Sequence, residues 1–164
     1  MDVTQAELEA LAAELGAVLL QRGWQLATAE SCTGGWAAQA ATAVAGSSSW
    51  FERGFITYSN EAKQEMLGVR AETLDAFGAV SEETAAEMAL GALTHSRAQA
   101  AFAITGIAGP SGGTPEKSVG TVCFAWARTG AAVVTARQQF SGGRQQVRAQ
   151  SVELALRKML ALMT

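Results

Sequence analysis

Three side chains that could act as nucleophiles stand next to one another in the segment AESCTGG (29–35): the hydroxyls of Ser31 and Thr33 and the thiol of Cys32. The segment lies between a short apolar strand and an alanine-rich helix, so its glycines fall in a strand-to-helix turn. Free backbone N–H groups and the helix dipole favour a bound anion or a developing oxyanion at such a turn. Serine and threonine more commonly cap a helix here, and capping is the alternative interpretation.

Three cations occur where a helix dipole disfavours them. Lys63 lies in the first turn of a helix predicted over 61–67, and Arg144 and Arg148 lie near the start of the last predicted helix, 143–163. A cation at the positive end of a helix is favourable when an anion is bound nearby. These positions therefore indicate a functional use. The commoner alternatives are a solvated lysine and arginines that pair with surface carboxylates.

A second glycine-rich segment, 106–113, follows the compact apolar run 100–105. The run predicts a buried strand, and the segment after it predicts a long loop at the carboxyl end of that strand. In α/β folds, ligands gather at the carboxyl ends of strands. We therefore expect this loop and the turn at 31–35 to form one pocket.

Hydrophobic periodicity predicts the elements that must position these residues. Thr4 and Glu7 form a capping box before a helix that ends at Arg22-Gly23, and Thr129-Gly130 predicts the turn of a hairpin. The other predicted elements are helices over 36–44, 61–67 and 71–77, a helix capped by Ser81, a helix over 143–163, and strands over 24–28, 54–59, 100–105, 119–128 and 132–140. This order predicts an α/β fold, namely a single-domain α/β/α sandwich with a mixed β-sheet over residues 1–164.

Composition excludes several classes of function. The net charge of -3 leaves no basic reserve for binding along a nucleic-acid backbone. No apolar run approaches the roughly 20 residues of a membrane-spanning helix, and the acidic, polar start over 1–9 is unlike a signal peptide. We therefore expect a cytoplasmic protein without nucleic-acid or membrane partners. Cys32 and Cys123 lie far apart and His95 is the only histidine, so no metal site is expected.

Several motifs that occur in order resemble the CinA C-terminal domain family. The resemblance extends from about Leu8 to Leu160. It rests on the motifs AESCTGG (29–35), YSN (58–60), AK (62–63), GAVS (78–81), TGIAGP (105–110) and VGTV (119–122). Two positions depart from the family pattern: Ser118 stands where the family usually shows proline, and Gly143 stands where an aspartate commonly precedes the arginine.

The resemblance implies hydrolysis of the carboxamide of nicotinamide mononucleotide to nicotinate mononucleotide and ammonia, as in pyridine nucleotide salvage. It also implies that neither a metal nor an organic cofactor is used and that the protein is a homodimer. Because an amide carbon is a poor electrophile, the reaction needs an activated nucleophile, a base and donors for the oxyanion. The resemblance assigns Ser31 as the nucleophile and Lys63 as the base, with Tyr58 orienting or relaying the proton.

A base with an ordinary pKa of about 10.4 must have its pKa lowered to accept a proton at neutral pH. We expect the nearby arginines and the helix N-terminus to contribute to this shift at Lys63. Backbone N–H groups from the glycine turn are expected to hold the oxyanion or the phosphate of the substrate. The expected substrate-binding residues are Thr33, Gly34, Gly35, Thr105, Gly106, Arg144 and Arg148.

Each assignment has an alternative. Cys32 is a rival nucleophile, since thiolates form more readily at helix N-termini. Tyr58 could be a core aromatic residue, and Thr105 could be an ordinary end of a strand. At the level of the whole chain, the alternative to an enzyme is a nucleotide-binding sensor or partner-binding module without chemistry.

Overall fold

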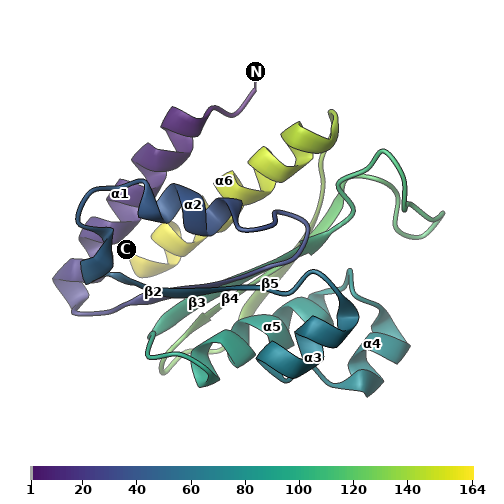
Figure 1. Cartoon of the computed structure of the whole chain (residues 1–164), viewed down its shortest axis with the longest axis horizontal. Helices are drawn as coiled ribbons and strands as arrows, with labels where there is room; N and C mark the ends of the chain where they lie inside the picture. The colour runs from purple at the N-terminus through teal and green to yellow at the C-terminus, as the bar shows by residue number, and fades with distance from the viewer. Residues whose placement is uncertain (1) are drawn as a thin grey trace.

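Five strands and six α-helices make up the computed structural model, which describes residues 2–164 (Figure 1). The elements are α1 (Gln5–Arg22), β1 (Leu26–Glu30), α2 (Trp36–Thr42), a 3-10 turn η1 (Ser47–Ser49), β2 (Phe51–Ile56), α3 (Asn60–Leu67), α4 (Ala71–Phe77), α5 (Glu82–Thr94), β3 (Ala100–Gly106), β4 (Thr121–Arg128), β5 (Val134–Gln139) and α6 (Arg144–Met163). None of the helices in this part of the chain combines the length and apolar character that crossing a bilayer needs.

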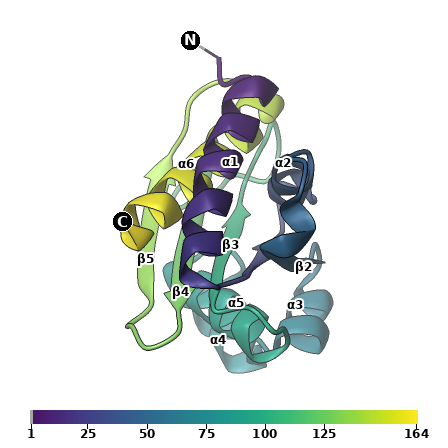
Figure 2. The ribbon, with the colours of Figure 1, turned by 90° about the vertical axis from the view of Figure 1, so that its left-hand side faces the viewer.

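The strands form one mixed sheet in the order β2-β1-β3-β4-β5. Strand β1 pairs in parallel with both β2 and β3. Strands β3, β4 and β5 pair antiparallel, and β4 and β5 form the predicted hairpin. Figure 2 shows how the sheet spreads between β5 at one edge and β2 at the other. The mixed sheet expected from the sequence is therefore confirmed.

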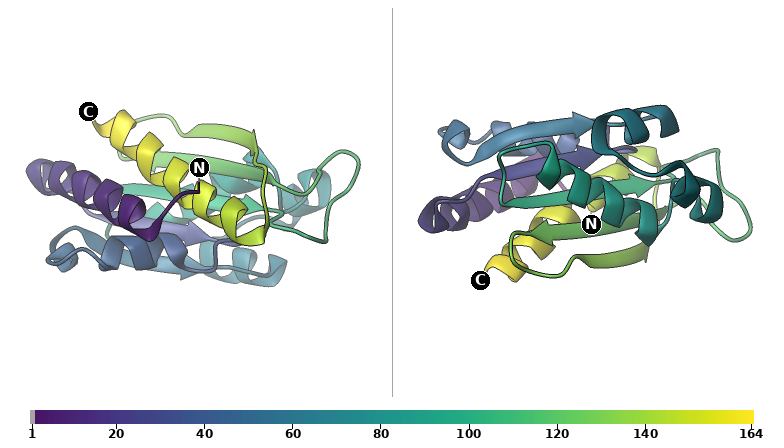
Figure 3. Two further views of the ribbon diagram at one scale, coloured as in Figure 1. Left: turned by 90° about the horizontal axis from the view of Figure 1, so that it is seen from above. Right: turned by 90° about the horizontal axis from the view of Figure 1, so that it is seen from below.

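The helices cover both faces of the sheet. Helices α1, α2 and α6 lie on one face and helices α3, α4 and α5 on the other, as the two views of Figure 3 show. The alternation along β1 explains the two layers, since Leu26 packs into the core under α1 and α6 while Ala27 packs into the core under α5. The predicted α/β/α sandwich is confirmed.

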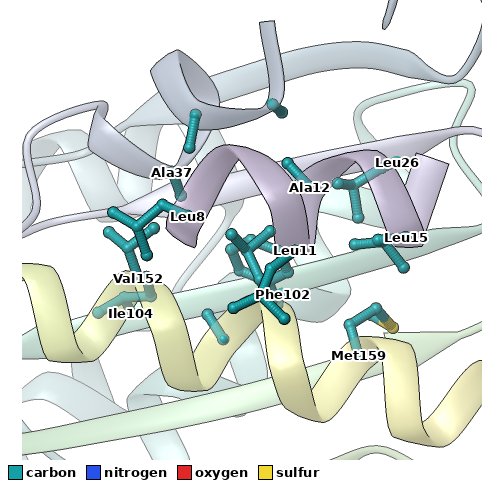
Figure 4. Close-up of a cluster of buried hydrophobic side chains, with 14 of the residues drawn as sticks. Leu8, Leu11, Ala12, Leu15, Leu26, Ala37, Phe102, Ile104, Val152 and Met159 are labelled. Carbon is teal, nitrogen blue, oxygen red and sulfur yellow. The ribbon is translucent and has the colours of Figure 1, made fainter. Parts of the chain in front are cut away.

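The larger core lies between the sheet and the α1–α2–α6 layer. Leu8, Leu11 and Leu15 of α1 recur at helical spacing and meet Phe102 of β3 and Val152 of α6 (Figure 4). All of these side chains are buried, and burying a leucine contributes roughly 1.5–3 kcal/mol. The capping box predicted at Thr4 is present and starts α1 in register with this core.

Four strands begin at different residues from those predicted: β4 and β5 each begin two residues late, at Thr121 and Val134, and β1 and β2 are also displaced. Strand β1 begins two residues later than predicted, because Gly23 adopts φ 69° and Trp24 still donates its N–H to Leu19 at the end of α1. Strand β2 begins at Phe51 rather than at 54, because pairing with β1 starts at Leu26, whose N–H donates to the preceding carbonyl of Trp50. The start of β2 could not be predicted from neighbouring residues, because it depends on pairing with a strand more than 20 residues earlier in the chain.

The carboxyl ends of β1 and β3 lie side by side. These strands are parallel neighbours, and the N–H of Ser31 donates to the carbonyl of Ile104 at 2.9 Å. The loop between β3 and β4 extends beyond this edge of the sheet, on the right in Figure 1. Both glycine-rich segments therefore leave the sheet at the same place.

Helices α3 and α5 are in close contact at Gly91 of α5. A substitution there tests whether α3, the helix that carries Lys63, packs as closely against α5 as the structure shows. A Cβ added to Gly91 would lie 2.0 Å from the carbonyl oxygen of Leu67. We expect Gly91→Ala to lower the free energy of unfolding by about 1–3 kcal/mol, because the backbone of α3 must move. Urea unfolding of Gly143→Ala, where no atom lies within 4 Å, is the control and should show a loss of at most about 1 kcal/mol, because only the N-cap residue of α6 changes. Equal stability of both variants would contradict this packing.

Candidate active site

The turn after β1 is organised by a buried carboxylate. Helix α2 has Gly35 at its N-cap with φ 105°, and no side chain caps it from that position. The N–H groups of the second and third helical residues donate instead to Glu30, at 2.9 and 3.0 Å. The alternative interpretation, in which Ser31 or Thr33 caps this helix, is therefore wrong, and both hydroxyls are left for other contacts.

Lys63 points from α3 to the end of β1. Ser59 caps α3 by accepting the N–H of Ala62 at 3.0 Å, which sets the start of the helix and the direction of the lysine. The Nζ atom of Lys63 donates to Ser31 Oγ at 3.0 Å and to the carbonyl of Thr57 at 3.0 Å. Lys63 is 1% exposed, so the alternative of a solvated lysine is wrong.

Burial lowers the pKa of Lys63 below its ordinary value of 10.5, because removal from water disfavours the ammonium form. The arginines expected to cause this shift do not contribute to it, and a thiolate at Cys32 would oppose it. The neutral amine can accept the proton of the Ser31 hydroxyl across the same 3.0 Å contact. The geometry thus provides a hydroxyl nucleophile with a base within hydrogen-bond reach.

Cys32 is a poor nucleophile in this position. Burial raises the pKa of its thiol to about 12, and the charge of Glu30 adds to this rise. Since the thiolate is the reactive form, the thiol stays protonated and inert at neutral pH. Its position beside a helix N-terminus does not help, because the carboxylate of Glu30 already occupies the donors there.

Ser31 and Lys63 open onto a cavity of about 270 Å³ at the carboxyl end of the sheet. Of the described residues that line it, two are cationic and none is acidic. The lining is formed by Ser31, Cys32, Tyr58, Asn60, Lys63, Ala79, Val80, Thr105, Gly106, Ile107, Ala108, Gly109, Ser111, Gly112 and Arg144. A larger hollow of about 510 Å³ beside Trp36 and Gln146 has no serine or lysine in its lining, so chemistry points to the smaller one.

Arg144 crosses from α6 to the cavity. Its guanidinium donates to the carbonyl of Gly109 at 2.8 Å and to the hydroxyl of Tyr58 at 3.2 Å. Tyr58 is 60% exposed, so it is not a core aromatic residue, and its hydroxyl has no hydrogen bond to Lys63. Arg144 forms no salt bridge with the described carboxylates, and its charge therefore faces the cavity without a protein counter-ion.

Thr105 and Gly106 form the far wall of the cavity at the end of β3. The buried hydroxyl of Thr105 donates to the carbonyl of Ala79 at 2.8 Å and so ties β3 to the segment before α5. A Cβ on Gly106 would lie 2.9 Å from the carbonyl of Thr121, so the glycine lets β4 approach. The hydroxyl of Thr105 thus has a structural partner as well as a place in the lining.

Four of the expected substrate-binding residues do not line the cavity. They are Thr33, Gly34, Gly35 and Arg148. Arg148 holds the turn from behind, with Nε donating to the carbonyl of Cys32 at 3.0 Å and Nη2 to that of Thr33 at 3.1 Å. Its guanidinium also lies over the ring of Trp36, 5.7 Å from the centroid. The expected alternative of a surface salt bridge is not found for it among the described residues.

Sequence reasoning missed two contributors to the site. Asn60, the first residue of α3, lines the cavity, and its place within the motif over 58–60 was the available signal. Glu30 supports the turn from outside the cavity. The sequence signal that could have identified Glu30 is a single acidic residue at the end of the otherwise uncharged stretch that forms β1.

The fold and the site together describe an α/β/α protein with a serine–lysine pair at a cationic cavity. The model of the CinA C-terminal domain matches residues 8–163. The nicotinamide-nucleotide amidohydrolase PncC of Escherichia coli K12 is 54% identical over 96% of this chain and 95% of its own. Its namesake from Pseudomonas putida is 49% identical over 94% and 96%.

Solved structures agree. The competence/damage inducible protein CihA from Agrobacterium tumefaciens superposes with a TM-score of 0.94 at 47% identity, covering 96% of both chains. A CinA superfamily protein from Escherichia coli gives a TM-score of 0.91 at 37% identity, covering 99% of both. The chain belongs to the CinA C-terminal domain family.

The environment of the two thiols is directly testable. Burial raises the pKa of Cys32 to about 12 and that of Cys123 to about 11. We therefore expect the folded protein to react only slowly with a thiol reagent at pH 8, whereas the unfolded chain should release two equivalents rapidly. Rapid reaction of one equivalent in the folded protein, located at Cys32 by peptide mass mapping, would show that Cys32 is activated and would reopen it as the nucleophile.

Proposed function

We propose that this protein is a nicotinamide-nucleotide amidohydrolase that converts nicotinamide mononucleotide to nicotinate mononucleotide and ammonia, in pyridine nucleotide salvage. The names of full-length relatives support the reaction. The observation that carries the proposal is the 3.0 Å contact between Lys63 Nζ and Ser31 Oγ at the mouth of the cavity. The homodimer expected from the family stays a prediction.

The charge and size of the cavity support a mononucleotide substrate. Arg144 is the permanently cationic residue of the described lining, Lys63 is the other basic one and none is acidic, so this surface attracts an anion such as a phosphate. A volume of about 270 Å³ lies just below the roughly 300–1,000 Å³ of typical ligand pockets, which favours a mononucleotide over a dinucleotide. We assign the phosphate to Arg144, because Lys63 bonds directly to the hydroxyl of Ser31 whereas Arg144 does not.

Acylation uses the serine and the lysine. The neutral amine of Lys63 takes the proton of Ser31 while Oγ attacks the carboxamide carbon, which forms a C–O bond and a tetrahedral oxyanion. The ammonium of Lys63 then returns this proton to the amide nitrogen, the C–N bond breaks and ammonia leaves. The product of this half-reaction is an ester between Ser31 and the nicotinoyl group.

Deacylation repeats the sequence with water. Lys63 accepts a proton from water as its oxygen attacks the ester carbon. The second tetrahedral intermediate collapses, the bond from carbon to Oγ breaks, and Ser31 regains a proton from Lys63. Nicotinate mononucleotide is released, and the enzyme returns to a neutral lysine and a serine hydroxyl.

Some N–H groups of the turn already donate to other residues, which reduces the number of candidate donors for the oxyanion. In the turn, the N–H of Gly34 donates to the carbonyl of Ser31 at 3.0 Å, and that of Trp36 donates to Thr33 at 3.0 Å. Among residues 2–164, the N–H of Cys32 donates to no other residue, and Cys32 lines the cavity. We therefore assign the N–H of Cys32, rather than that of Gly34, to the oxyanion.

Removing either member of the pair should abolish most turnover. We expect Ser31→Ala and Lys63→Met to lower kcat for ammonia release from nicotinamide mononucleotide by at least about 10²–10⁴-fold, because each removes nucleophile or base. Exposed Ser48→Ala and half-buried Lys158→Met are matched controls away from the cavity and should retain activity. Mass spectrometry should show the product amide replaced by an acid.

The same assay separates the enzyme from the alternative. Saturable binding of nicotinamide mononucleotide by the wild-type protein without ammonia release would favour the nucleotide-binding sensor. Turnover that persists in Ser31→Ala would support the proposed amidohydrolase activity but would refute Ser31 as its nucleophile. Both results are read from purified protein with one substrate.

The pH dependence reports the state of Lys63. An ammonium has no lone pair, so kcat/KM should rise with pH as Lys63 loses its proton and level off above its pKa. Because burial lowers this pKa, the midpoint of the rise should lie below 10.5. Lys63→Arg should show no rise, since arginine stays protonated. A midpoint at or above 10.5 for the wild type would contradict Lys63 as the buried base.

A further inference from the structure

Glu30 is a buried acidic side chain that the reaction does not use directly. It is 1% exposed and accepts three hydrogen bonds: one from the hydroxyl of Thr33 at 2.6 Å, and two from the N–H groups of Ala37 and Ala38 at 2.9 and 3.0 Å. Both carboxylate oxygens are engaged, and neither faces the cavity. All three donors lie in the turn after Ser31 or in the first turn of α2.

Side chains at the end of β1 alternate across the sheet, and this alternation places Glu30 opposite its reactive neighbour. Glu30 bonds to α2 on one face, whereas Ser31 meets Lys63 of α3 on the other face. The carbonyl of Glu30 also accepts the N–H of Thr57, whose own carbonyl binds Lys63. The peptide unit that carries Ser31 is thus held on both sides.

We propose that Glu30 is a positioning residue: its carboxylate ties the 31–35 turn to α2 and so holds Ser31 Oγ at hydrogen-bond distance from Lys63. This inference rests on the proposed function. Three hydrogen bonds to one buried carboxylate define the orientation of the turn more strongly than neutral contacts do. Because reacting groups must be held closely, a displacement of about 1 Å lowers turnover by roughly 100-fold.

Glutamine at this position separates charge and hydrogen bonding from size. In one orientation of its amide, the NH₂ group faces the N–H of Ala38; in the other, it faces that of Ala37. A donor opposite a donor cannot bond, so each orientation of Glu30→Gln loses one backbone contact. Glu30→Ala loses all three contacts.

The experiment compares kcat and KM for nicotinamide mononucleotide in wild type, Glu30→Gln and Glu30→Ala, together with hydrogen exchange of the segment 31–38. We expect kcat to fall about 10-fold in Glu30→Gln and about 100-fold in Glu30→Ala, with KM changed less than about 3-fold. Exchange should accelerate within 31–38, because the lost contacts are in that turn. Should Glu30→Ala not fold, Glu30→Gln decides.

Glu7→Gln is the matched control. Glu7 also accepts hydrogen bonds at a helix N-terminus, from the N–H and the hydroxyl of Thr4 at 2.7 and 3.1 Å, but it lies in α1 outside the cavity lining. A general loss of helix capping would lower thermal stability in both Gln variants. A fall in kcat confined to the Glu30 variants separates positioning from stability.

Two results would overturn the inference. The first is a folded Glu30→Gln with wild-type kcat and wild-type exchange over 31–38. The second is a loss of kcat that Glu7→Gln shares to the same extent. If the wild type itself releases no ammonia, the proposed function fails, and the exchange data then decide whether Glu30 holds the turn: faster exchange confined to 31–38 supports it, and unchanged exchange refutes it.

Discussion

The burial of a lysine beside a serine hydroxyl is the constraint on which this site depends. Removing Lys63 from water disfavours its charged form, and the same removal makes the amine available as a base. The carbonyl of Thr57 and the hydroxyl of Ser31 satisfy the nitrogen, so it does not stay an unpaired buried group. Burial needs α3 to lie close against α5, which the absence of a side chain at Gly91 permits.

The sheet brings the reacting groups together from separate parts of the chain. Because β1 and β3 are parallel neighbours, the turn after β1 and the loop after β3 share one edge. Helix α6 closes the same region from the opposite end of the sequence, with Arg148 binding the carbonyls of the turn and Arg144 reaching the cavity. Two arginines four residues apart on one helix thus have separate positions, one behind the turn and one at the cavity.

Local pattern predicted most elements and the residues that meet at the site. The capping box at Thr4 and the cap at Ser81 were predicted from sequence because capping depends on neighbouring residues. The start of β2 and the position of Arg148 behind the turn were not predictable, since each depends on partners far along the chain. The cap supplied by Glu30 was missed because this side chain reaches past the turn to helical residues seven and eight positions later. The family resemblance, rather than spacing, distinguished Ser31 from Cys32, and the buried thiol supports that choice.

The loop from 107 to 120 has a consequence for how this architecture can diversify. Its two ends are joined by paired contacts between Ile107 and Gly120 or Thr121, while several of its residues form one wall of the cavity. Ser31 and Lys63 belong to the opposite wall, and their side chains share no hydrogen bond with this loop. The serine–lysine contact and this wall of the cavity therefore belong to different segments, so a change in the length or side chains of the loop would leave the contact between Ser31 and Lys63 intact.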